Sequence, residues 1–260
     1  MSAATPMLHR RRLLASAAAL PLAGSLHRAA AQEADAAALL SRAADVMADL
    51  RSFHFELSTP QGETAVMETL VLERVEGDVL RPDRYRAAVE ARAAMLDLSL
   101  EVIGVGDRVW ISDPTSATGG FFEVPLDETT SPQERLRLAN LLNPDVLWLA
   151  ALSLVTEQEI LGENTIDGEP VTRVDGVLDL SRIAAFAPAE ADEAAVALPS
   201  LPVSVWLTES GHLRRLEAEG AILEGEAPDV VRRLDLTRFD EPVTIEPPAD
   251  VREPAFDGMG

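Results

Sequence analysis

Hydrophobic residues first recur at helical spacing and then alternate within residues 35–58. In the second part of this stretch, Phe53, Phe55 and Leu57 alternate with polar neighbours. Spacing of three and four residues places side chains on one stripe of a helix, whereas alternation places them on one face of a strand. The stretch therefore predicts an amphipathic helix that leads directly into the first strand of a sheet, which it covers. The helical stripe comprises Leu39, Leu40, Ala43, Val46, Met47 and Leu50.

Alternating segments in the N-terminal half predict a meander of antiparallel strands joined by tight turns. The clearest is residues 96–105, where every second position from Leu96 to Val102 is apolar. Glycine and aspartate mark turns at residues 76–78 and 106–107. The predicted strands are residues 64–75, 84–91, 96–105, 108–112 and 121–124.

Two helices are predicted in the middle of the chain. Ser131-Pro132-Gln133-Glu134 is a capping box with proline at the first helical position, which indicates the start of a helix rich in leucine. Asn143-Pro144-Asp145 restarts the chain as a second helix, residues 146–155, which is apolar nearly all round. Such a helix is either deeply buried or lines an apolar cavity.

The C-terminal half returns to strands, which we expect at residues 157–163, 171–180, 203–208, 212–223 and 230–239. Asp167-Gly168 and Glu209-Ser210-Gly211 predict turns between them. Residues 181–197 are rich in alanine and acids and predict a helix or a mobile loop. We expect residues 32–260 to form a single domain, because no linker long or polar enough to divide them is present.

Residues 1–31 are predicted to be a signal peptide. Arg10-Arg11-Arg12-Leu13-Leu14 opens an alanine-rich apolar stretch, and Ala29-Ala30-Ala31 precedes Gln32 as a small-residue cleavage site. The paired arginines and leucines resemble a twin-arginine signal, with an ordinary secretory signal as the alternative. No later segment approaches the ~18–20 apolar residues of a membrane span. We therefore expect an extracytoplasmic protein (in the periplasm, in the cell envelope or secreted), soluble after cleavage or held by an uncleaved signal.

The chain of 260 residues is strongly acidic, with a net charge of −22. The predicted signal carries four arginines and no acid, so the remainder has a charge of −22 − 4 = −26. Such a surface repels phosphate backbones and anionic lipid headgroups, which excludes nucleic-acid binding.

Residues that carry catalytic or metal chemistry are scarce. The chain contains no cysteine and no lysine, which excludes thiolate sites, disulfides and Schiff bases. Outside the predicted signal, the histidines are His54 and His212, which are far apart in sequence and poor material for a metal site or a triad. No nucleophile elbow and no phosphate-binding glycine loop is present. We expect no enzymatic activity, no cofactor and no metal.

The order of the segments resembles a known family. The likeness is carried, after the signal, by LLSRAADVMADLRSFHFEL, VGDRVWI, IDGEPVTRVDGVLDL, VSVWLTESGHLRRLE and FDEPVTIEPP. In this order the chain resembles the LppX/LprA/LprF/LprG family of lipoproteins, known from mycobacteria and present in other bacteria. The resemblance covers nearly all of residues 32–260.

The resemblance implies an α+β fold like that of the periplasmic lipoprotein carrier LolA. This fold is a curved antiparallel β half-barrel with helices covering its concave face. Members of the family carry acylated lipids or glycolipids between membranes and have no catalytic residues. They usually have a lipidated cysteine after the signal, whereas this chain has Ala29-Ala30-Ala31 there, which excludes anchoring by acylation of cysteine.

We therefore expect a non-enzymatic carrier that holds the acyl chains of a lipid or glycolipid in an apolar cavity. Its other partners would be membranes or an envelope transporter, in transient contact. The candidate cavity residues are Phe55, Leu57, Leu98, Leu100, Leu141, Leu147, Trp148 and Leu152.

Two other functions stay open at this stage. The first is a chaperone-like or structural domain with a solid core, which binds another exported protein. The second is a hydrolase with two catalytic carboxylates, although sugar-binding clefts usually offer aromatic platforms and aromatic residues make up only 4% of the chain.

Overall fold

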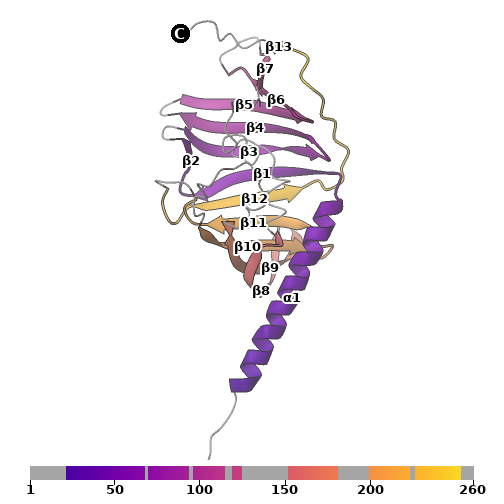
Figure 1. Cartoon of the computed structure of the whole chain (residues 1–260), viewed down its shortest axis with the longest axis vertical. Coiled ribbons are helices and arrows are strands. Elements are labelled where there is room, and N and C mark those ends of the chain that lie inside the picture. Colours follow the sequence, from indigo (N-terminus) through magenta and orange to yellow (C-terminus); the bar gives the residue numbers. More distant parts are fainter. Residues whose placement is uncertain are drawn as a thin grey trace, which may run out of the picture.

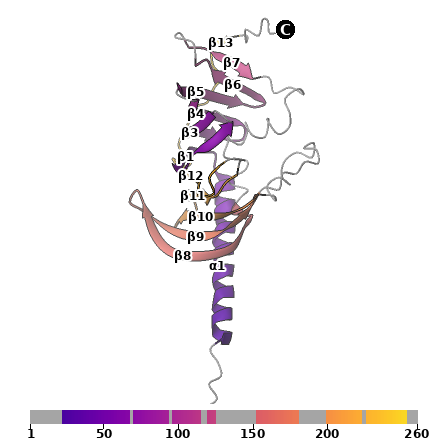
Figure 2. The same ribbon diagram turned by 90° about the vertical axis from the view of Figure 1, so that its left-hand side faces the viewer.

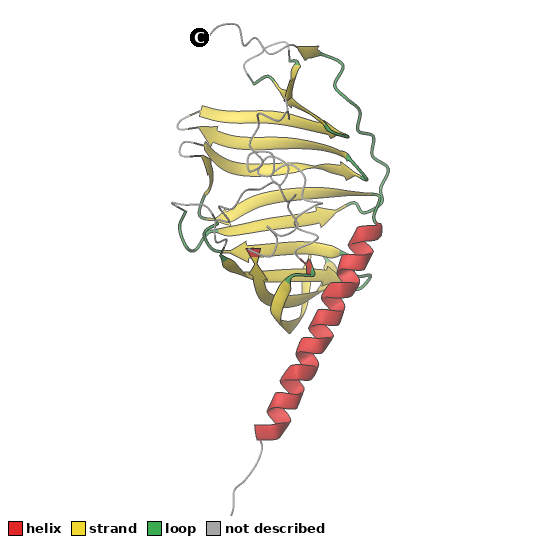
Figure 3. Cartoon of the chain, in the orientation of Figure 1, coloured by secondary structure: helices red, strands yellow, loops and turns green. Residues whose placement is uncertain are grey.

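The structure is a computed structural model that describes residues 22–67, 70–93, 96–114, 119–124, 152–180, 199–222 and 226–252. These residues form one large curved sheet and one long helix, α1 (Leu22–Asp49) (Figure 1). Figure 3 shows how strands dominate the described part of the chain. The described part contains no helix long and apolar enough to cross a membrane.

The sheet consists of two antiparallel meanders, one from each half of the chain. The first runs β1-β3-β4-β5-β6-β7 and the second runs β12-β11-β10-β9-β8, and they join where β1 pairs with β12. The strands are β1 (Ser52–Gln61), β2 (Thr64–Met67), β3 (Leu70–Leu80), β4 (Arg84–Ala93), β5 (Leu96–Val105), β6 (Arg108–Ser112), β7 (Phe121–Val124), β8 (Val155–Ile166), β9 (Glu169–Asp179), β10 (Ser200–Thr208), β11 (Leu213–Glu219), β12 (Val231–Thr237) and β13 (Val251–Arg252).

The sheet is open, with β8 at one edge and β13 at the other. Figure 2 shows β8 and β9 bent into arcs, which gives the sheet its curvature. The backbone of β8 is irregular at Glu157 and Gly162, which both have positive φ and lie at register shifts against β9. Such bulges bend a strand and interrupt its ladder of hydrogen bonds. The expectation of a curved antiparallel sheet that does not close is confirmed.

The two faces of the sheet differ in polarity, as the alternation along the strands predicts. On β1, Phe53 and Phe55 are buried, whereas His54 and Glu56 on the opposite face pair with charged residues of β3. We call the face that carries Phe53, Phe55 and their cross-strand partners the apolar face, and the other the polar face. Arginine–carboxylate pairs between neighbouring strands cover much of the polar face, as with Arg86–Glu101 and Arg233–Glu217.

Helix α1 packs on the apolar face through the predicted stripe. Leu40, Ala43, Met47 and Leu50 are buried in the same cluster as Phe53 and Phe55, which confirms the predicted helix and its face. The helix begins at Leu22, earlier than the sequence pattern indicates, and its N-terminal part extends beyond β8 (Figures 1 and 2). The predicted helices at residues 131–142 and 146–151 and the segment 181–197 lie outside the described residues, so α1 is the one long helix described.

The end of α1 is held by Arg81, in the turn between β3 and β4. Its Nη1 donates to the carbonyl oxygens of Met47, Ala48 and Leu50 at 2.5, 2.8 and 2.9 Å. The last carbonyls of a helix have no partner within the helix, and a cation there also complements the helix dipole. The guanidinium carbon of Arg81 further lies 5.6 Å from the centroid of the Phe53 ring, a cation–π contact. Arg81 thus fixes the helix to the sheet.

The predicted turn at residues 76–78 is wrong. Gly77 lies within β3, where it pairs with Phe55 on one side and Ala87 on the other. A Cβ atom added to Gly77 would lie 2.1 Å from the carbonyl oxygen of Arg86. The glycine is therefore required by the close approach of β4 and not by a reversal of the chain. The chain turns after Leu80 instead, at residues 81–83.

Two other strand boundaries also differ from the prediction. Residues 64–75 are not one strand, because β2 folds back on β3 and Met67 pairs with Leu70. No glycine or proline marks this reversal, so the sequence pattern does not reveal it. The predicted helix 146–155 ends too late, because β8 starts at Val155. The boundaries of β5, β6 and β7 and the turns at Gly106-Asp107, Asp167-Gly168 and residues 209–211 are confirmed.

The C-terminal tail, residues 238–250, crosses from the end of β12 to the far edge of the sheet (Figure 1). Ser52 Oγ donates to the carbonyl oxygen of Glu241 at 2.7 Å, and Arg84 Nη1 donates to that of Ile245 at 3.1 Å. The tail ends in β13, which pairs in parallel with β7. It therefore connects the C-terminal meander to the outermost strands of the N-terminal meander.

The tail also builds a second, small core on the polar face. Ile245 is 2% exposed and packs with Ile103 of β5 and Trp110 of β6. Arg108 covers the Trp110 ring, with its guanidinium carbon 4.7 Å from the ring centroid. Apolar residues that the alternation assigns to the polar face are thus buried by the tail.

Replacing Arg81 with alanine should lower the free energy of unfolding by about 2 kcal/mol, because three helix-terminal carbonyls lose their charged donor. Arg86→Ala is the matched control. Its exposed ion pair with Glu101 should contribute less than about 1 kcal/mol. Urea unfolding monitored by circular dichroism measures both, and equal effects of the two substitutions would contradict the assignment.

Replacing Ile245 with alanine should lower the free energy of unfolding by about 2 kcal/mol, since it removes a buried side chain from the small core. The neighbouring residue Thr244 is exposed, so Thr244→Ala should change stability by less than about 0.5 kcal/mol. Thermal unfolding of both variants tests this. A tail that is only loosely attached would make the two variants indistinguishable.

Candidate functional site: the apolar face of the sheet

One cross-strand row of apolar side chains runs across nine strands. Each member is the registered partner of the next, and the pairings join both meanders through Leu57 and Leu234. Eight inter-strand spacings of ~4.8 Å give the row a length of about 38 Å along the sheet. We call this row the apolar track. Its members are Ile160, Val174, Val205, Leu216, Leu234, Leu57, Val75, Val89 and Leu100.

The structure brings four of the eight predicted cavity residues into one cluster. Phe55 and Leu152 are each 1% exposed, and Leu57 and Leu100 are partly buried against the same core. Leu98 lies on the same face, where it pairs with Ala91, and is also partly buried. Leu141, Leu147 and Trp148 lie outside the described residues.

Tyr85 also belongs to the apolar face, although it was not among the predicted residues. It pairs with Val79 and Gly104, and its ring occupies the space above Gly104, where an added Cβ atom would lie 2.2 Å from the ring. Burial raises the pKa of its hydroxyl to about 12, because the phenolate is poorly solvated there. Tyr85 alternates in phase with Ala87 and Val89 along β4, and this pattern in the sequence assigns it to the same face.

An ion pair interrupts the apolar face near the first residue of β12. Arg232 lies in phase with Leu234 and Leu236 and pairs with Ala218, so it occupies the apolar face and not the polar one. Its Nη2 donates to Glu226, and the two side chains are 7% and 0% exposed. The sequence shows that Arg232 alternates in phase with these leucines. It does not show that Glu226 pairs with it.

The carboxylate of Glu226 belongs to the loop between β11 and β12. Its Oε2 accepts from the backbone N–H of Ile222 at 2.9 Å, and Arg232 Nη1 donates to the carbonyl oxygen of Gly220 at 3.0 Å. The guanidinium thus binds the loop at its first residue, Gly220, and at Glu226. On β1, the register against β12 shifts between Ser58 and Gln61, beside Arg232.

The polar face offers no comparable site among the described residues. His54 Nδ1 lies 2.8 Å from Asp78, whereas His212 Nδ1 lies 2.8 Å from Ser210 Oγ and its ring stacks on Phe239, so each histidine has partners of its own. No group of three histidine, aspartate or glutamate side chains in the described part is arranged to hold a metal.

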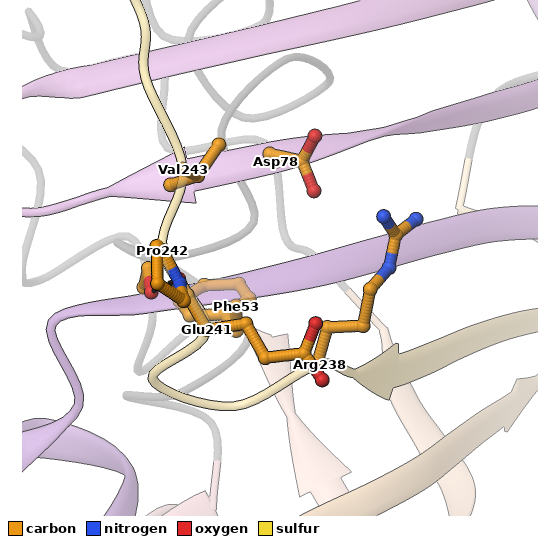
Figure 4. Close-up of a pocket in the computed structure, with 7 residues that line it drawn as sticks. Phe53, Asp78, Arg238, Glu241, Pro242 and Val243 are labelled. Carbon is orange, nitrogen blue, oxygen red and sulfur yellow. Dashed lines mark hydrogen bonds between the residues drawn. The ribbon is translucent and has the colours of Figure 1, made fainter.

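A pocket of about 60 Å³ lies where the tail leaves β12 (Figure 4). Phe53, Asp78, Arg238 and Glu241 contribute to its lining. Ligand pockets usually measure ~300–1,000 Å³, so this one is too small for an acyl chain. Ser52, which also lines it, already donates to a tail carbonyl and is buried, which argues against a nucleophile here.

Comparisons with known proteins agree on the fold. Residues 35–245 match the family model described as LppX_LprAFG lipoprotein. The crystal structure of LprF from Mycobacterium bovis is similar over 83% of this chain and 97% of that one, with 17% identity and a TM-score of 0.57. The lipoprotein LppX from Mycobacterium tuberculosis is similar over 82% and 100%, with 19% identity and a TM-score of 0.52. No curated protein sequence matches the chain.

The raised pKa of Tyr85 has a measurable consequence. The folded-state pKa lies above the ordinary value near 10, so this contribution to stability is fully present below pH ~10 and is lost as the pH rises through about 12. The total loss should be about 3 kcal/mol. Tyr85 is the one tyrosine in the sequence, so phenolate absorbance reports it alone. Titration of the native protein near pH 10, as in urea, would contradict burial of the ring.

Proposed function

The chain belongs to the LppX_LprAFG lipoprotein family, and we propose that it is an exported, non-enzymatic carrier of acylated lipids or glycolipids. It holds the acyl chains against the apolar face of the sheet and moves them through the cell envelope. The apolar track is the observation that carries this proposal. It is about 38 Å long, whereas the buried stripe that packs the helical segment on the sheet, from Ala36 to Leu50, spans only about 21 Å. It also includes the partly exposed leucines Leu57 and Leu100.

Burial of methylene groups supplies the driving force. Each CH₂ removed from water contributes about 0.8 kcal/mol, so a long acyl chain binds well without a specific polar contact. In this proposal, Phe55, Leu57, Leu98, Leu100 and Leu152 line the acyl site. Leu141, Leu147 and Trp148, from the predicted middle helices, complete it, and these helices cover the face together with α1.

The predicted signal, residues 1–31, supports an extracytoplasmic location for the carrier. The sequence contains no cysteine, so the thioether anchor of a lipoprotein is not available to it. The proposed carrier is therefore diffusible in the periplasm or envelope after cleavage, or held by an uncleaved twin-arginine signal. Transient contact with membranes or a transporter would load and unload it.

The rival function is a chaperone-like or structural domain with a solid core. The nearly complete burial of Phe55 and Leu152 favours it, because both side chains are enclosed as in a packed interior. The two functions differ in whether lipid accompanies the protein.

Protein purified from its host should release lipid on organic extraction, and native mass spectrometry should show a bound mass that is lost on delipidation. Leu100→Glu should lower the bound lipid at least tenfold, because it introduces a charge into the apolar track. Ser99→Glu, at the adjacent exposed position on the polar face, is the matched control and should retain lipid.

Circular dichroism establishes that both variants are folded. A lipid-free wild-type protein would overturn the carrier function and favour the solid-core domain. Equal lipid content in the two variants would show that the lipid does not lie along the apolar track.

A further inference from the structure

The buried pair Arg232–Glu226 is not explained by the stability of the core. Moving two charges out of water costs several kcal/mol per ion, and replacing such a pair with apolar residues is often neutral or stabilising. The other residues of β12 on the apolar face are Leu234 and Leu236, which fit the core without this cost. A guanidinium on this face therefore has a role other than packing.

The two partners of the pair are anchored differently. Arg232 belongs to β12, in the middle of the sheet, with β11 and β1 on either side. Glu226 belongs to the loop between β11 and β12 and lies outside the strands. The arginine is thus the fixed member, and the carboxylate is an anion that the loop brings to it. Guanidinium forms paired hydrogen bonds equally well with carboxylate and with phosphate.

Arg232 also lies beside the apolar track. It is two residues from Leu234 on the same face of β12, a distance of about 7 Å along the strand. The described residues engage Nη1 and Nη2 of the guanidinium, through Gly220 and Glu226. The cation therefore lies beside the middle of the track, where it can meet the headgroup of a lipid whose acyl chains run along the track on either side.

We propose that Arg232 is the headgroup site of the carrier and that it takes an acyl lipid with an anionic headgroup, a phosphate or a carboxylate. Glu226 occupies this site in the absence of lipid and is displaced by the headgroup of the ligand. This inference rests on the proposed function, because it concerns the same apolar face.

Replacement of Glu226 by the headgroup allows an anionic lipid to bind although the protein is strongly negative. The net charge of −22 repels anions at a distance, but this repulsion is screened beyond ~8 Å at physiological salt. At the site itself, one anion replaces another at Arg232, and the released carboxylate of Glu226 is solvated by water. Glu226 therefore competes with the ligand and weakens its binding.

The test compares lipids that share acyl chains and differ in headgroup charge. Delipidated wild-type protein is titrated with dipalmitoyl phosphatidic acid and with dipalmitoylglycerol, and separately with palmitate and with hexadecanol. Within each pair, the ratio of the affinity for the anionic lipid to the affinity for the neutral lipid gives the contribution of the headgroup charge to binding, since burial of the chains is constant. Inorganic phosphate, as competitor, separates a lipid headgroup from a free phosphate.

The two partners should change this ratio in opposite directions. Glu226→Gln should raise the ratio of anionic to neutral affinity about tenfold, because the internal competitor is lost. Arg232→Gln should bring this ratio within about twofold of one, while neutral lipid still binds. Arg233→Gln is the matched control. It is the adjacent residue, on the polar face, where it pairs with Glu217, and it should leave the ratio unchanged.

Each outcome decides the proposal. Equal ratios in the wild type, Glu226→Gln and Arg232→Gln, with lipid bound, would overturn the headgroup site and leave the carrier function intact. Binding of neither lipid by the wild type would overturn both. If inorganic phosphate abolishes the preference for phosphatidic acid over dipalmitoylglycerol, the site is assigned to free phosphate instead. If Arg232→Gln does not fold, Glu226→Gln alone decides, by raising the ratio or leaving it unchanged.

Discussion

The pairing of β1 with β12 is the constraint on which the rest of the structure depends. It joins residues far apart in the sequence, such as His54 with Thr237, and makes one sheet of two meanders. The register places Leu57 opposite Leu234, so the apolar rows of both halves meet. A shift by one residue would turn Phe53, Phe55 and Leu57 to the polar face and break the apolar track at its centre.

The sequence predicts local elements well wherever one period dominates. The stripe of α1 and the alternation of β5 are strong patterns, and both lie where the patterns place them. Gly77 was misread because glycine signals both turns and close packing between strands, and only the contact with Arg86 decides between them. The hairpin between β2 and β3 carries no turn residue at all. Local propensity cannot settle such positions, because their neighbours come from other strands.

The candidate site was predictable in kind and not in detail. Alternation identifies Phe55, Leu57, Leu98 and Leu100 as members of one face, but not which of their neighbours meet across the sheet. Tyr85 and Arg232 follow the same alternation, yet their roles depend on Gly104 and on Glu226, which the topology brings beside them. The long-range pairing that aligns β12 with β1 has no local signature in the sequence.

The C-terminal tail has a consequence for the synthesis of the protein. Trp110 lies in the N-terminal half, but its burial depends on Ile245, more than a hundred residues later. A nascent chain that stops before this residue can form both meanders and still leave the indole in water. The fluorescence of Trp110 would therefore distinguish chains that include Ile245 from chains that stop before it. For a protein whose predicted signal implies export in the folded state, a segment synthesised after both meanders thus completes the polar face of the sheet.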